Sequence, residues 1–109
     1  MNDETAIASL SALAQDHRLS AYRRLVRAGK TGLSAGAIAE ALGIAPSSLS
    51  FHLAQLSQAG LVTQERQHRT LIYRADFGAI RALVGFLLEN CCEADGCGAS
   101  ATCELEQTL

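Results

Sequence analysis

The sequence contains no long apolar run, only one proline, and no cysteine in its first 90 residues. Because its apolar runs are only a few residues long, a membrane-spanning helix of about 20 apolar residues is excluded. The acidic start, Met1 to Glu4, lacks the basic and apolar regions of a secretory signal, so we expect a cytoplasmic protein with no membrane partner. With 49% hydrophobic residues and Pro46 as its single proline, the 109-residue chain is expected to fold as one mainly helical domain.

The net charge of −2 argues at first against binding to nucleic acid. However, all nine basic residues lie between positions 15 and 81 together with only four acids, so this part of the chain carries a charge of +5. The remaining acids lie near the two ends. The middle of the chain therefore offers a basic surface for an anionic partner.

Apolar spacing and turn residues predict the order of the elements. We expect helices over residues 3–14, 16–28, 34–42, 46–59 and 76–90, and a β-hairpin over residues 61–75. Asp16 and Ser34 are the expected N-caps of the second and third helices, and Pro46 is expected in the first turn of the fourth. The hairpin tip, near Gln67 and His68, has no glycine pair, so a loop longer than two residues is expected. The second helix is expected to turn Leu19, Tyr22, Leu25 and Val26 inward. The predicted apolar faces are Ile7, Leu10, Leu13 and Ala14 in the first helix and Ile80, Leu83, Val84, Leu87 and Leu88 in the last.

The third and fourth predicted helices, separated by residues 43–45, have the layout of a helix-turn-helix. The outer face of the fourth helix carries short or amide side chains that can hydrogen-bond bases and phosphates, and no carboxylate lies between Glu40 and Glu65. The alternative is an ordinary solvated helix. We expect recognition of double-stranded DNA, because the helix-turn-helix spacing, the hairpin and a basic preceding helix agree. The predicted DNA-binding residues are Ser47, Ser48, Ser50, His52 and Gln55, with Arg66 and Arg69 in the hairpin.

The run SLSFHLAQLSQAGLV at residues 48–62, followed by Arg66 and Tyr73, resembles the ArsR/SmtB family of winged helix-turn-helix metalloregulatory repressors. The resemblance implies a homodimer, joined through its first and last helices, that binds an operator and releases it when an inducer binds. The apolar faces of those two helices fit this role, and each of their residues fits an intramolecular core nearly as well. We expect residues 1–90 to form the DNA-binding and dimerisation domain and residues 91–109 a flexible, cysteine-rich sensor tail.

Two metal sites known in the family are absent from this sequence. Residues 32–37 contain no Cys-Val-Cys motif of the arsenic-sensing type, and residues 76–78 lack the histidine of the zinc-sensing Asp-x-His motif. We expect His52 to make a DNA contact or a helix-packing hydrogen bond, and we treat His17 and His68 as non-ligands.

The four cysteines, Cys91, Cys92, Cys97 and Cys103, all lie in the last nineteen residues. They resemble the ligands of arsenic-responsive members that use an adjacent cysteine pair and a later cysteine. We expect Cys91, Cys92 and Cys97 to bind As(III), with Cys103 as the alternative third ligand and Sb(III) as an alternative inducer. Three thiolates suit As(III), whereas zinc prefers four ligands in paired Cys-x-x-Cys knuckles.

Several alternatives to arsenite sensing stay open. The same fold could sense Cd, Pb or Zn, or could sense oxidants or sulfide through a disulfide, and the tail could carry incidental thiols. An enzyme is not expected, because adjacent cysteines differ from a Cys-x-x-Cys redox motif and no acid/base constellation surrounds them. No cofactor is expected to be needed for folding.

Overall fold

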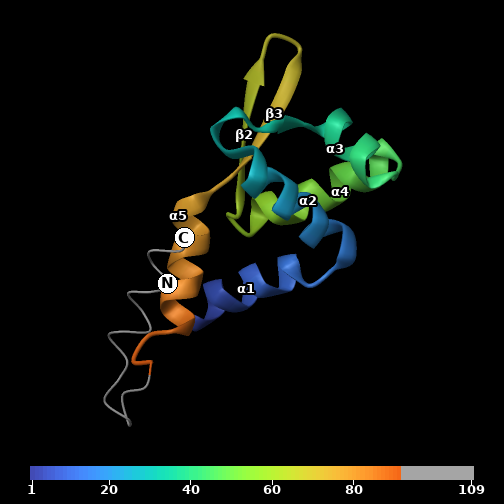
Figure 1. Cartoon of the computed structure of the whole chain (residues 1–109). Coiled ribbons are helices and arrows are strands. Elements are labelled where there is room, and N and C mark those ends of the chain that lie inside the picture. The colour runs from blue at the N-terminus through green and yellow to red at the C-terminus, as the bar shows by residue number, and fades with distance from the viewer. Residues whose placement is uncertain (92–109) are drawn as a thin grey trace.

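The computed structural model describes residues 1–91, which form five α-helices and a three-stranded antiparallel sheet (Figure 1). Within these residues no helix is both long and apolar enough to span a membrane. Residues 92–109, including three of the four cysteines, lie outside the described part of the chain. The elements are α1 (Asp3–Leu13), α2 (Asp16–Ala28), a 3-10 turn (Gly29–Thr31), β1 (Leu33–Ser34), α3 (Ala35–Leu42), α4 (Pro46–Gln58), β2 (Val62–Gln67), β3 (Thr70–Ala75) and α5 (Phe77–Leu87).

Most helices begin where a side-chain oxygen accepts a hydrogen bond from a first-turn amide. Ser34 and Asp76 cap α3 and α5 in this way. The N-cap of α2 is Gln15, whose side chain accepts from the amide of Arg18 at 2.9 Å, so the prediction that Asp16 is the N-cap was wrong. Asp16 is instead the first helical residue, where its negative charge complements the positive end of the helix dipole.

The helix-turn-helix is formed by α3 and α4, as predicted. Gly43 ends α3 in the left-handed conformation, with φ of 67°, and Pro46 occupies the first turn of α4. The inner face of α4 is buried in a core shared with α2 and α3, which consists in part of Tyr22, Leu25, Ile38, Leu49, Leu53 and Leu56. This packing fixes the angle at which α4 presents its outer face.

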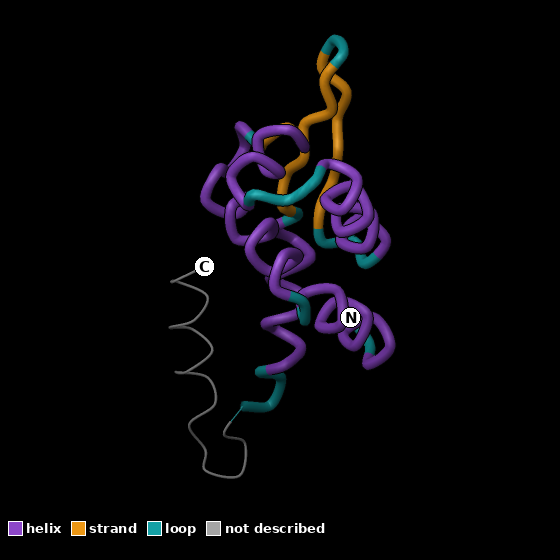
Figure 2. The backbone as a smooth tube through the Cα atoms, turned by 90° about the vertical axis from the view of Figure 1, so that its right-hand side faces the viewer, coloured by secondary structure: helices purple, strands orange, loops and turns teal. Residues whose placement is uncertain are grey.

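The hairpin of β2 and β3 projects from the end of the molecule opposite α1 and α5 (Figure 2). Gln67 pairs with Thr70, so the loop consists of His68 and Arg69 alone, and the prediction of a longer loop was wrong. His68 supplies the required backbone geometry with φ of 60°, a conformation that is uncommon for a residue other than glycine.

A third strand, β1, was not predicted, because two residues carry no periodic pattern. Leu33 and Ser34 pair with Tyr73 and Ile72, which makes β3 the central strand. Gly32 precedes β1 with φ of 69°, and a Cβ atom at Gly32 would lie 2.6 Å from the carbonyl oxygen of Tyr73. This close approach explains why the chain has glycine immediately before the strand.

The small side chains of α1, and not its large ones, face the rest of the chain. Ala6, Ser9 and Ala12 are buried, whereas Ile7 is 63% exposed and Leu10 is 43% exposed. For Ile7 and Leu10 this exposure rules out the alternative of an intramolecular core and leaves the dimer role that was expected for their face of the helix. Leu19 and Val26 are exposed as well, so the prediction that these two residues of α2 face inward was wrong. Leu87 on α5 is also exposed.

A single residue, Asp76, separates the end of β3 from the start of α5. Its amide donates to the carbonyl oxygen of Leu61 at 2.8 Å, and its side chain accepts from the amide of Ala79 at 3.1 Å. The hairpin and the last helix are therefore joined through one residue whose backbone and side chain are both hydrogen-bonded.

Candidate nucleic-acid interface

The first turns of α4 present a polar surface without acidic side chains. Ser47, Ser48 and Ser50 are exposed, and Ala45, at the N-cap, makes no side-chain capping hydrogen bond. The backbone amides of the first turn are therefore left for an external acceptor at the positive end of the helix dipole. Hydroxyl groups and uncapped amides together suit a phosphate or a base edge.

Phe51 is an exposed aromatic side chain on the same helix face as Ser47, one turn later. It is 59% exposed, and sequence reasoning did not select it. The helical spacing of α4 could have identified Phe51. Leu49 and Leu53 are buried on one side of the helix, and Phe51, midway between them in the sequence, lies on the opposite side.

His52 faces the start of α2. Its Nδ1 lies 3.4 Å from Nη1 of Arg18, and its ring centroid lies 5.7 Å from that of His17. Burial, followed by the charges of Arg18 and His17, lowers the pKa of His52 below its usual value of 6.5. His52 was expected to make either a DNA contact or a helix-packing hydrogen bond, and the structure contains the helix-packing contact.

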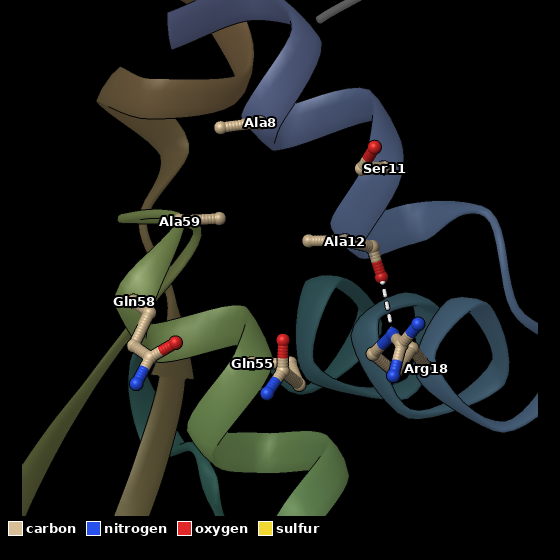
Figure 3. A pocket seen from close by; sticks show the side chains of 7 residues that line it. All are labelled: Ala8, Ser11, Ala12, Arg18, Gln55, Gln58 and Ala59. Carbon is tan, nitrogen blue, oxygen red and sulfur yellow. Dashed lines mark hydrogen bonds between the residues drawn. The ribbon is translucent and has the colours of Figure 1, made fainter.

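Gln55 also differs in position from the three serines. It lines a pocket between α4 and α1, together with Gln58 (Figure 3). The predicted residues of α4 thus divide into an exposed group of serines and a group, His52 and Gln55, that lies against the first two helices.

The hairpin carries two arginines, Arg66 and Arg69, whose side chains are exposed. Within residues 1–91 neither forms an ion pair, since the ion pair found there joins Arg74 to Glu65 at 3.2 Å. A hydrogen bond from Gln67 and the contact with Arg74 lower the pKa of Glu65, so this carboxylate stays ionised. Arg74 also donates to the carbonyl oxygen of Lys30 at 2.7 Å, so it supports the base of the hairpin. Since Glu65 pairs with Arg74, the charges of Arg66 and Arg69 remain for an anionic partner.

Helix α2 adds a further cationic surface. Arg23, Arg24 and Arg27 line a hollow of about 160 Å³ together with Ser20 and the apolar residues Leu19 and Leu42. This cluster accounts for much of the positive charge in the middle of the chain.

Cys91 is the one predicted metal ligand within the described residues. It follows α5 closely, is half-buried, and its amide donates to the carbonyl oxygen of Leu88 at 2.8 Å. Cys92, Cys97 and Cys103 lie outside the described part. Among residues 1–91, no three His, Cys, Asp or Glu side chains are grouped as metal ligands would be.

Comparisons with known proteins agree with the helix-turn-helix. A family model described as a helix-turn-helix domain matches residues 13–65. The nodulation protein NolR of Rhizobium meliloti is 34% identical over 84 residues, which cover 77% of this chain and 66% of NolR. The transcriptional activator HlyU of Vibrio cholerae is 30% identical over 94 residues, which cover 86% of this chain and 84% of HlyU.

Solved structures share this fold over 72–90% of the chain. An ArsR-like transcriptional regulator from Rhodococcus sp. RHA1 superimposes with a TM-score of 0.74 over 90% of each chain, at 23% identity. The homodimeric winged helix-turn-helix domain of Mb0332 from Mycobacterium bovis, a possible ArsR-family regulator, has a TM-score of 0.65 at 25% identity and covers 83% of this chain and 89% of that one. A possible transcriptional regulator for arsenical resistance has a TM-score of 0.59 at 30% identity and covers 72% of this chain and 79% of that one.

The fold, the exposed polar helix and these relatives together define a winged helix-turn-helix transcriptional regulator that binds DNA. The chain belongs to the ArsR family of such regulators.

Proposed function

We propose that the protein is a homodimeric repressor that releases its operator when As(III) binds to Cys91, Cys92 and Cys97. The proposal rests on the position of Cys91, which lies four residues after the end of α5, the helix that Asp76 joins to the DNA-binding hairpin. The similarity to a possible transcriptional regulator for arsenical resistance supports the same function. The protein acts in the cytoplasm, where thiols stay reduced and able to bind a metalloid.

The exposed apolar residues support the homodimer. Ile7 and Leu10 on α1 and Leu87 on α5 are large and exposed. Figure 1 shows that these two helices lie at the end of the molecule away from the hairpin. Burying them against a second copy removes apolar surface from water, and the solution structure of Mb0332 is a homodimer. Two copies then present two α4 helices to one operator.

In the DNA complex, α4 lies in the major groove and the hairpin flanks it. Ser47, Ser48 and Ser50 bind base edges or phosphates, and Arg66 and Arg69 bind phosphates or the minor groove. Phe51 supplies an apolar surface of the kind that contacts a thymine methyl group. His52 holds α4 against α2 through Arg18, and Gln55 stays a further candidate for DNA contact.

As(III) supplies a centre that forms three bonds to thiolate sulfur. Cys91 would anchor it at the end of α5, and residues 92–109 would deliver the second and third thiolates, with Cys103 as the alternative to Cys97. Arsenite enters as As(OH)3, and each As–S bond that forms replaces one As–O bond, with the thiol proton and the released hydroxide leaving as water. A coupling of about 1–3 kcal/mol between the two sites would weaken operator binding by roughly 5–150-fold.

The test is fluorescence anisotropy of labelled operator DNA with the reduced full-length protein, with and without arsenite. We expect arsenite to release the wild type and to have no effect on Cys91→Ser, Cys92→Ser or Cys97→Ser. Cys103→Ser is the matched control and should respond like the wild type. If arsenite fails to release the wild type, the proposal is wrong, and release only after oxidation would identify a disulfide sensor instead. If Cys103→Ser abolishes the response and Cys97→Ser does not, Cys103 is the third ligand.

A further inference from the structure

A pocket of about 380 Å³ lies between α1 and α4, well away from the cysteines in sequence. Its volume falls in the range of about 300–1,000 Å³ that small-molecule sites occupy. Figure 3 shows that the small side chains of Ala8 and Ala12 on α1 lie across the space from Gln55 and Gln58 on α4. The lining residues are Ala8, Ser11, Ala12, Arg18, Gln55, Gln58 and Ala59.

Arg18 is the one charged side chain of this lining. Its Nε donates to the carbonyl oxygen of Ala12 at 2.8 Å, and its Nη1 lies 3.4 Å from His52, which holds the guanidinium in place. Within residues 1–91 no carboxylate lies within ion-pair distance of it. A guanidinium carries five N–H donors, so two contacts leave others for a ligand.

The neutral polar groups of the lining also have hydrogen-bonding capacity left. The side chains of Ser11, Gln55 and Gln58 make no hydrogen bond to the described part of the chain. Three alanines, Ala8, Ala12 and Ala59, supply the apolar part of the wall. The pocket thus combines one positive charge, several neutral hydrogen-bonding groups and an apolar wall.

We propose that this pocket binds a small organic monocarboxylate. The single guanidinium pairs with one carboxylate in a charge-assisted hydrogen bond, and the amides and hydroxyl of the lining complete its hydrogen bonds. The alanines contact the apolar body of the ligand, which an inorganic anion lacks. Ala8 lies about 100° around α1 from Ile7, so the pocket opens beside the exposed apolar face and not on it.

This site does not depend on arsenite, on residues 92–109 or on DNA, so its failure and the failure of arsenite sensing are distinguishable. The measurement is the amide and side-chain NH spectrum of reduced, 15N-labelled full-length protein without arsenite or DNA. Benzoate and indole-3-acetate are the probes, benzamide is the neutral control and sulfate is the inorganic control. We expect saturable shifts with the two carboxylates at Ala8, Ala12, Ala59 and the side-chain amides of Gln55 and Gln58.

Two variants test the lining directly. Arg18→Gln should weaken benzoate binding by about tenfold or more, the worth of a charge-assisted hydrogen bond, while Arg23→Gln, on the same helix outside the pocket, should leave it unchanged. Ala8→Leu fills the space from an exposed helical position and should abolish binding without unfolding the protein. The proposal is overturned if no probe gives saturable shifts, if benzamide or sulfate binds as well as benzoate, or if Ala8→Leu leaves binding unchanged.

Discussion

Nη1 of Arg18 lies 3.4 Å from Nδ1 of His52, and this contact joins the start of α2 to the middle of the DNA-binding helix. The same guanidinium donates through Nε to the last turn of α1, at the carbonyl oxygen of Ala12. One side chain therefore connects three helices, and the orientation of α4 depends on it as well as on the apolar core.

We expect the free energy of unfolding to depend on pH through the titration of His52. Burial and the charges of Arg18 and His17 lower the pKa of His52 in the folded state, so protonation favours the unfolded chain. The contribution of His52 to stability is present above the unfolded pKa of about 6.5 and is lost as the pH falls through the lower folded pKa. Urea unfolding at a series of pH values should show a smaller acid loss for His52→Gln than for the wild type.

His68, at the exposed hairpin tip, provides the matched control for this experiment. His68→Gln should retain the pH dependence of the wild type. An unchanged acid loss in His52→Gln would contradict the assignment to His52.

Gly32 should tolerate no side chain. Its backbone, with φ of 69° and ψ of −175°, lies in a region that only glycine adopts readily, and a Cβ would lie 2.6 Å from the carbonyl oxygen of Tyr73. We expect Gly32→Ala to lower the free energy of unfolding by about 2 kcal/mol or more. Gly36→Ala, within α3 and facing open space, should leave it unchanged or raise it by up to about 1 kcal/mol. Similar stabilities for the two variants in urea unfolding would refute this explanation of β1.

The buried hydroxyl of Tyr22 has no hydrogen-bond partner within the described residues. Burial, and secondarily the charge of Asp76, raises the pKa of Tyr22, so the hydroxyl stays neutral. We therefore expect Tyr22→Phe to leave the free energy of unfolding unchanged or to raise it by about 1 kcal/mol, because an unsatisfied polar group is removed. Tyr22→Ala should lower it by about 3–5 kcal/mol through loss of the ring, and a comparable loss in Tyr22→Phe would show that the hydroxyl is bonded.

The two arginines of the hairpin should contribute to DNA affinity by neutralising phosphates. Removing either charge, as Arg66→Gln or Arg69→Gln, should weaken operator binding and reduce the slope of log affinity against log salt by about 1 for each phosphate left without its arginine. Arg81→Gln, an exposed position on α5, is the control and should retain the wild-type slope. Wild-type salt slopes for both hairpin variants would exclude Arg66 and Arg69 from the interface.

The sequence predicted elements that have a long periodic pattern or a clear terminator. Gly43 and Pro46 locate the turn of the helix-turn-helix, and the spacing of Leu49, Leu53 and Leu56 identifies the inner face of α4. Features that depend on tertiary distances were missed. Strand β1 is too short to show alternation.

The positions of side chains around the site were predicted less well than the elements. The burial of α1 is decided by how closely its neighbours approach, which favours alanine and serine over Ile7 and Leu10. His52 and the serines of α4 can all form hydrogen bonds, so the sequence alone does not distinguish them. The position of Arg18 in the fold shows that His52 packs against α2, whereas the serines are exposed.

Asp76 has a consequence for how a signal could cross the molecule. A single residue has only two soft backbone dihedral angles, and those of Asp76 are restrained by its hydrogen bonds to Leu61 and Ala79. The connection can therefore bend little when α5 tilts, and we expect a tilt of α5 to be passed on to β3, the central strand of the sheet. Since no flexible linker separates the last helix from the hairpin, we expect a change in the tilt of α5 to shift the hairpin that bears Arg66 and Arg69.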